Sequence, residues 1–138
     1  MHRIMAIDFG DARTGVAISD LLCSIDGSTA VVNSHNTDKA IEDIALMAQN
    51  NQVGCIVVGL PKNMDGTEGP RAALCREFAD QLAKRTGLEI KMWDERRTTV
   101  EAHNILSQHN YHGKKRKNTV DAVAASLILE GYLAFLGR

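Results

Sequence analysis

Short apolar runs separated by turn residues dominate the first third of the chain and return twice in its middle. The runs at 4–7 and 16–18 flank a turn and predict a hairpin, and the β-branched residues at 28–33 predict a third strand. A fully apolar run at 55–59 is typical of a strand buried on both faces, and 88–93 alternates as a further strand. The pattern therefore predicts five strands.

Segments with apolar positions at helical spacing lie between and after these strands. The predicted helices are 38–50, 71–85, 98–108 and 118–136, with the third beginning at Thr98 or Thr99. Strands at the start, followed by alternating helices and strands, predict an α/β layer fold on a mixed sheet.

Two polar segments interrupt this pattern. The loop at 60–70 is rich in glycine and proline and follows the carboxyl end of a buried strand, where long loops are usually functional. The segment 109–117 is predicted to be a polar connection, and it ends in four basic residues, Lys114, Lys115, Arg116 and Lys117. Such a run is either a solvated loop or an anion-binding patch, and the sequence leaves both interpretations open.

The composition narrows the class of protein. Because 44% of the 138 residues are hydrophobic, we expect residues 1–138 to form a single domain with its own core. The net charge of −1 does not indicate a general nucleic-acid binder, so an anionic partner requires a local basic patch. The three cysteines include no C-x-x-C pair, which predicts reduced thiols in a cytoplasmic protein without a disulfide framework or a zinc knuckle. No apolar run reaches the roughly 18 residues that a membrane span requires, so we expect a soluble protein.

Carboxylates follow the ends of several predicted elements. Asp8 follows the first strand, Asp94 and Glu95 follow the last, and Asp121 lies in the first turn of the final helix. Ligands of open α/β sheets bind outside the carboxyl ends of the strands, so acids far apart in sequence can converge there. Since a charge at the end of a buried strand is costly without a partner, Asp8 is the strongest candidate for a functional residue.

Clustered carboxylates without histidine or cysteine favour hard cations, so we expect Mg²⁺ or Mn²⁺ rather than zinc. Such ions complete their coordination with substrate phosphate, which makes phosphodiester cleavage a natural chemistry for the site. Each acid also has a structural interpretation. Asp121 suits a helix N-terminus, Asp94 suits a solvated turn, and Glu95 has basic neighbours with which it can pair.

Four motifs are distributed over essentially the whole chain: AIDFG at 6–10, VGLPKNMDGT at 58–67, WDER at 93–96 and DAVAA at 121–125. Together they resemble the YqgF/RuvX family. The resemblance implies the ribonuclease H-like fold shared with the RuvC resolvases, a mixed five-stranded sheet with three antiparallel strands followed by parallel strands, flanked by helices. Family members are described as Holliday-junction resolvases or as nucleases that mature the 5′ end of the small-subunit ribosomal RNA precursor.

The family's three acids correspond to Asp8, Glu95 and Asp121. The resemblance implies that these residues are catalytic and bind Mg²⁺ or Mn²⁺. The expected contacts to nucleic-acid phosphates are Lys62 and Arg71 on the glycine-rich loop, Arg96, and the basic residues Lys114, Lys115, Arg116 and Lys117. A purely structural role for the loop at 60–70 competes with this interpretation.

Two positions depart from the family pattern, which usually has Thr or Ser at Asp11 and commonly Leu at Arg97. A second acid beside Asp8 either coordinates metal or repels a phosphate by like-charge repulsion. We expect Asp11 to face solvent.

Three functions remain open. The first is a metal-dependent nuclease that acts on structured RNA in ribosome biogenesis and processes the 5′ end of pre-16S rRNA. Its nearest variant is a resolvase of four-way DNA junctions. A strictly monomeric protein would count against that variant, because a resolvase makes two cuts on a two-fold junction. The second is a non-catalytic RNA-binding assembly factor, which three phosphate-repelling acids disfavour. The third is an ATP-binding protein of the actin and sugar-kinase class, which shares an Asp-x-Gly hairpin but requires two such domains.

Overall fold

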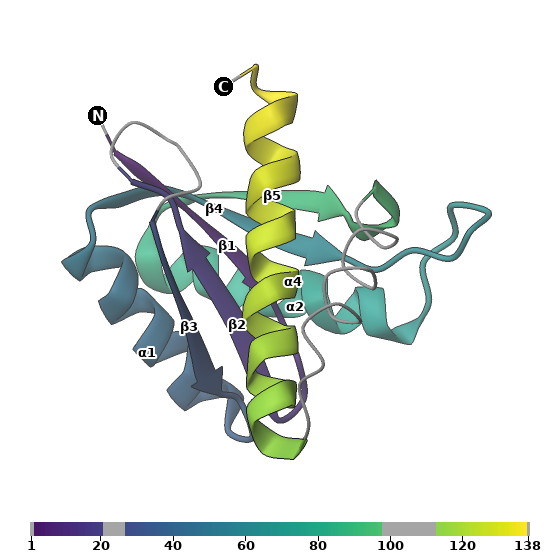
Figure 1. The fold of residues 1–138 in the computed structure, drawn as a ribbon, viewed down its shortest axis with the longest axis horizontal. Coiled ribbons are helices and arrows are strands. Elements are labelled where there is room, and N and C mark those ends of the chain that lie inside the picture. The colour runs from purple at the N-terminus through teal and green to yellow at the C-terminus, as the bar shows by residue number, and fades with distance from the viewer. Residues whose placement is uncertain (1, 21–26, 98–112, 138) are drawn as a thin grey trace.

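The computed structural model describes residues 2–20, 27–97 and 113–137, with side chains for 2–20, 27–96 and 120–137. Its elements appear in Figure 1. They are β1 (Arg3–Asp8), β2 (Arg13–Ile18), β3 (Ser28–Asn33), α1 (Thr37–Asn50), β4 (Val53–Leu60), α2 (Pro70–Thr86), β5 (Glu89–Asp94), the 3₁₀ turn η1 (Glu95–Arg97) and α4 (Gly113–Phe135).

One five-stranded sheet organises the chain in the order β3-β2-β1-β4-β5. The pairs β1–β2 and β2–β3 are antiparallel, whereas β1–β4 and β4–β5 are parallel. Parallel strands require a crossover connection, and α1 and α2 supply the two that this sheet needs. The predicted mixed sheet, antiparallel first and parallel afterwards, is confirmed.

Helices cover both faces of the sheet, with α1 and α2 on one face and α4 across the other (Figure 1). The alternation of side chains along β1 divides the core accordingly. Met5 and Ile7 pack in the cluster with α1 and α2, whereas Ile4 and Ala6 pack in the cluster with α4. Asp8, two residues after Ala6, therefore lies on the face that α4 covers.

The limits of the helices agree with most of the sequence signals. The side chain of Asn36 caps α1 by accepting from the backbone N–H of Lys39 at 3.1 Å. Helix α2 begins at Pro70, one residue before the predicted start, and ends at Thr86, where Gly87 caps it with a left-handed φ of 71°.

The predicted connection through Lys117 is wrong in its last part, because α4 begins at Gly113. Lysine and arginine are good helix formers, so a basic run continues a helix as readily as it forms a loop. The predicted start of this helix at 118 is therefore wrong, because Asn118 and Thr119 lie inside it. The predicted helix at 98–108 and the connection at 109–112 fall outside the described residues.

Candidate functional site

The carboxylate of Asp8 lies between two glycines on the neighbouring strands. Asp8 pairs directly with Gly15 on β2. On the other side Ile7 pairs with Val58 in parallel register, so the next residue, Asp8, lies beside Gly59 on β4. Neither neighbour has a side chain on the face that α4 covers, which leaves space around Asp8 for groups from other elements.

Glu95 occupies the space above Gly59. It follows β5 directly, at the carboxyl end of the parallel strands. A Cβ atom on Gly59 would lie 2.5 Å from Glu95 Oε1 and 2.7 Å from Ile128 Cδ1, so any larger residue would displace the glutamate. The side chains of Glu95 and Asp8 are hydrogen-bonded to each other. The sequence-predicted pair is therefore in direct contact.

Asp121 reaches the same area because α4 lies very close to β2. A Cβ atom on Gly15 would be 2.0 Å from the backbone oxygen of Asp121, a distance that real atoms do not adopt. The Asp121 side chain forms an ion pair with Arg13 at the start of β2, with 3.2 Å between Arg13 Nε and Asp121 Oδ2. The third predicted acid thus lies near the first two but is held by a cation of the chain itself.

We expect Gly15→Ala to destabilise the protein by about 1–3 kcal/mol, because the added methyl group meets backbone that moves only if α4 moves. Urea denaturation followed by circular dichroism measures the effect. Gly54→Ala is the matched control, since the three atoms nearest to its Cβ all belong to the exposed side chain of His2 rather than to backbone. Equal stability of the two variants would contradict the close packing of α4 on β2.

Burial raises the pKa values of the three acids, and repulsion by a neighbouring acid adds to the effect for Asp8 and Glu95. Burial, followed by the charge of Asp8 and the hydrogen bond to it, raises the pKa of Glu95 to about 8. Burial also raises the pKa of Asp8, and the charge of Asp121 adds to this, while the hydrogen bond from Glu95 opposes it. Asp8 therefore ionises first, and near neutral pH the protonated carboxyl of Glu95 donates to the carboxylate of Asp8. Burial raises the pKa of Asp121, against the opposing effect of Arg13.

The donor set of the site consists of carboxylate oxygens, which suits a hard divalent cation. Within residues 2–20, 27–97 and 113–137, no three His, Cys, Asp or Glu side chains lie close enough together to hold a metal ion. Two carboxyls that share a proton form a pair in which a cation can replace that proton. Asp8 and Glu95 fit two ligands of such an ion, whereas Asp121 is ion-paired to Arg13.

Two of the basic residues predicted to contact phosphate, Arg71 and Arg96, are engaged with groups of the chain itself. The guanidinium of Arg71 donates to the carboxylate of Asp11 at 2.7 Å and to the backbone oxygen of Phe9, and it lies over the Phe9 ring at 5.1 Å. As predicted, Asp11 faces solvent, with its side chain 86% exposed. Arg71 also lowers the pKa values of Asp8 and Glu95, so its charge acts on the acidic pair.

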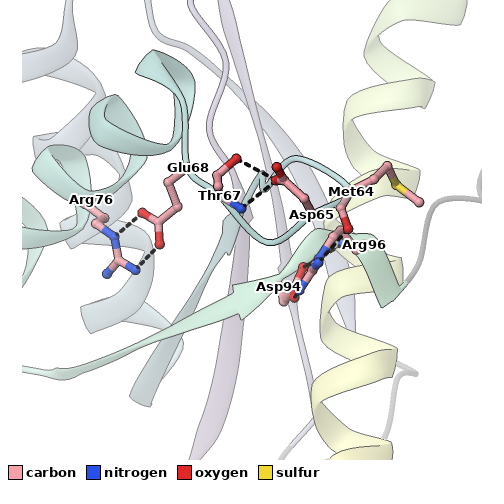
Figure 2. Close-up of polar contacts among 7 residues, drawn as sticks. All are labelled: Met64, Asp65, Thr67, Glu68, Arg76, Asp94 and Arg96. Carbon is pink, nitrogen blue, oxygen red and sulfur yellow. Dashed lines mark hydrogen bonds and ion pairs between the residues drawn. The ribbon is translucent and has the colours of Figure 1, made fainter.

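Arg96 forms a fork with the carboxylate of Asp94, with contacts of 2.7–3.1 Å, and also donates to the backbone oxygen of Met64 at 3.2 Å (Figure 2). This fork holds the pKa of Asp94 down to about 2, and Lys62 contributes in the same direction. Asp94 is therefore held in an ion pair with Arg96, whereas its alternative interpretation was an acid in a solvated turn. The side chains of Lys114, Lys115, Arg116 and Lys117 lie outside the described residues.

Sequence reasoning missed the two glycines and Arg13. The sequence signal for the two glycines is the alternation of side chains along a strand. Gly15 and Ala17 on β2, like Val57 and Gly59 on β4, lie on the face of the sheet that α4 covers. A glycine in a buried strand marks a close approach by another group. Here it marks the positions of Glu95 and Asp121.

A comparison with protein families finds that residues 2–134 match the model of the family described as "RuvX: Holliday junction resolvase". Curated relatives match from end to end. A protein of Halothermothrix orenii is 45% identical, over 99% of this chain and 97% of its own length, and one of Carboxydothermus hydrogenoformans is 40% identical over 99% of each. Both are named "Putative pre-16S rRNA nuclease".

Two solved structures share the fold at low sequence identity. The RuvC protein of T. thermophilus in complex with a Holliday junction substrate is 10% identical with a TM-score of 0.63, over 100% of this chain and 98% of that one. The resolvase of Fowlpox virus, also solved with junction DNA, is 10% identical with a TM-score of 0.63 over 99% of both chains. This likeness confirms the ribonuclease H-like fold. No described helix has the length and apolar character that crossing a bilayer requires.

Proposed function

Because this chain belongs to the RuvX family, we propose that it is a metal-dependent nuclease that processes the 5′ end of pre-16S rRNA. The observation that carries the proposal is the half-buried, hydrogen-bonded pair of Asp8 and Glu95 at the carboxyl edge of the sheet. A protein that only bound phosphate would not benefit from two half-buried acids in contact, since both repel the ligand. The names of the full-length relatives indicate the substrate.

Asp8 and Glu95 would hold the cation, Mg²⁺ or Mn²⁺, with Asp121 as the third ligand in this proposal. When bound, such an ion stabilises the charge of the phosphate and lowers the pKa of the attacking water. Glu95 must give up its proton before it can act as a ligand. Arg13 holds Asp121 in the metal-free protein, and Arg71 adds positive charge beside the acids.

The acids alone do not attract the phosphates of an RNA backbone. The acids repel phosphate unless a cation is present, so the substrate must be held by basic residues nearby. Helix α4 carries Lys114, Lys115, Arg116 and Lys117 in the turns that precede Asp121, so its first turns bring basic residues to the site end of the helix. In this proposal they contact phosphates, together with Lys62 and Arg71.

A cleavage assay on two substrates tests the proposal. One is a precursor RNA that contains the 5′ end of 16S rRNA, and the other is a four-way DNA junction, each with Mg²⁺, Mn²⁺ or EDTA. We expect cleavage of the RNA with either metal and none in EDTA. Cleavage of the junction alone would instead establish a resolvase, and binding of the RNA without cleavage of either substrate would establish an assembly factor.

We expect Asp11→Asn to increase the affinity for RNA by a few-fold, because the ion pair that occupies Arg71 is exposed and such pairs contribute about 0–1 kcal/mol. Releasing Arg71 adds a cation for phosphate, so the affinity should also fall more steeply with salt. Fluorescence anisotropy at several salt concentrations measures both. Asp38→Asn, an exposed acid in the first turn of α1, is the control. An unchanged salt dependence in Asp11→Asn would contradict the role given to Arg71.

A further inference from the structure

The loop between β4 and α2 exposes one large apolar side chain at its tip. Met64 is 89% exposed, more than any other large hydrophobic residue that the structure describes. Single exposed hydrophobic residues are common on protein surfaces and need no explanation by themselves. What distinguishes Met64 is the fixed loop that carries it and the position of that loop beside Glu95.

Hydrogen bonds within the loop fix its conformation. The backbone N–H groups of Asn63 and Gly66 donate to the oxygens of Thr67 and Asn63, each at 2.8 Å. The carboxylate of Asp65 accepts from both the backbone N–H of Thr67, at 3.0 Å, and its hydroxyl, at 2.6 Å (Figure 2). The tip is therefore ordered before any ligand binds, which lowers the entropy cost of using it as a contact.

The loop is also tied to the candidate site. The oxygen of Met64 accepts from Arg96, whose guanidinium is held by Asp94, and Glu95 lies between these two residues in the sequence. In Figure 2 the Met64 side chain extends away from the hydrogen-bonded side chains, while its backbone faces the Asp94–Arg96 pair. The loop therefore lies at the same end of β5 as Glu95.

The chemistry of the tip favours contact with bases rather than with phosphates. Asp65, the residue next to Met64, has a carboxylate that repels the nucleic-acid backbone, and the guanidinium of Arg96 is held by the carboxylate of Asp94. Met64 itself is apolar, flexible and of the size that architectural nucleic-acid-binding proteins insert between stacked bases. Resting on the proposed nuclease function, we propose that Met64 inserts beside a base of the substrate and separates it from its stack next to the scissile phosphate.

Two measurements on matched RNAs test this role. The RNAs share one cleavage-site sequence, which is single-stranded in the first and borders a duplex in the second, with 2-aminopurine beside the scissile phosphate. We expect Met64→Ala to cut the duplex-bordered RNA about tenfold more slowly, which corresponds to about 1.4 kcal/mol, and to cut the single strand at the wild-type rate. Met64→Leu, which keeps an apolar side chain of similar size, should restore cleavage. Leu46→Ala, an exposed apolar residue on α1, is the control.

The second measurement does not depend on cleavage. In an Asp8→Asn background, binding of the duplex-bordered RNA should raise the fluorescence of 2-aminopurine, and adding Met64→Ala should remove that rise. If the wild type cuts neither RNA but the rise depends on Met64, the proposed function fails and the role of Met64 stands. If Met64→Ala keeps the rise, or slows cleavage of both RNAs equally, Met64 does not separate stacked bases.

Discussion

Asp8→Asn is expected to lower metal-dependent cleavage of the precursor RNA by roughly 10³-fold or more. Asp8 is the central acid of the site, because it contacts Glu95 directly and its pKa responds to Asp121. The amide of Asn carries no charge and provides one weak oxygen ligand, so a divalent cation loses its strongest partner. Cleavage rates at saturating Mg²⁺ and Mn²⁺ measure the loss.

The same substitution should leave the fold intact. The amide oxygen of Asn accepts the hydrogen bond that Glu95 donates, and removing the half-buried charge relieves its repulsion with Asp121. We therefore expect the thermal midpoint of Asp8→Asn in EDTA to equal or exceed that of the wild type. Asp80→Asn, an exposed acid on α2, is the control for cleavage. Undiminished cleavage by Asp8→Asn would show that the reaction takes place elsewhere.

The sheet and the location of the acids could both be predicted from the positions of the strands in the sequence. Apolar runs with short turns identify strands, and acids at strand ends identify an edge where ligands bind. These two patterns predicted that acids far apart in the chain converge at this edge, and the family resemblance selected Glu95 as the acid that joins Asp8 there. They did not reveal how close the elements approach one another. That information lies in Gly15 and Gly59, which look like turn or flexibility signals until the register of the strands is known.

The partners of the basic residues could not be predicted from the pattern. An arginine near a catalytic acid is expected to contact substrate, yet Arg71 and Arg96 pair with Asp11 and Asp94. Side-chain pairing depends on distances of a few ångströms between loops, and hydrophobic periodicity does not specify those distances. Arg13 was missed for the same reason, because only the close packing of α4 brings Asp121 within its reach.

The stability of the metal-free protein should fall as the pH rises between about 4.5 and 8. The pKa of Glu95 is raised to about 8 from its ordinary value of 4.5, so in this range the folded protein keeps a proton that the unfolded chain has released. The stabilising contribution is complete below the ordinary pKa and is lost as the pH rises through 8. Its slope cannot exceed ~1.4 kcal/mol per pH unit for one proton.

Urea denaturation in EDTA at pH 5, 6, 7 and 8 measures this slope. The groups that act on Glu95 are Asp8, Arg71 and Asp94. Glu95→Gln should remove most of the slope, since its amide donates to Asp8 at every pH. Glu130→Gln, at an exposed position on α4, should keep the slope of the wild type. A slope that survives in Glu95→Gln would place the titrating group elsewhere.

Divalent cations should reverse this pH dependence, because an ion bound by Asp8 and Glu95 takes the place of the shared proton. We expect Mg²⁺ or Mn²⁺ to stabilise the wild type more at pH 8 than at pH 6, and binding at pH 7 to release a proton from Glu95. Titration calorimetry in two buffers with different ionisation enthalpies counts that proton. Glu95→Gln should bind the metal more weakly and release none. Proton release that is equal in the two proteins would mean that the cation is held by other groups, even if cleavage requires it.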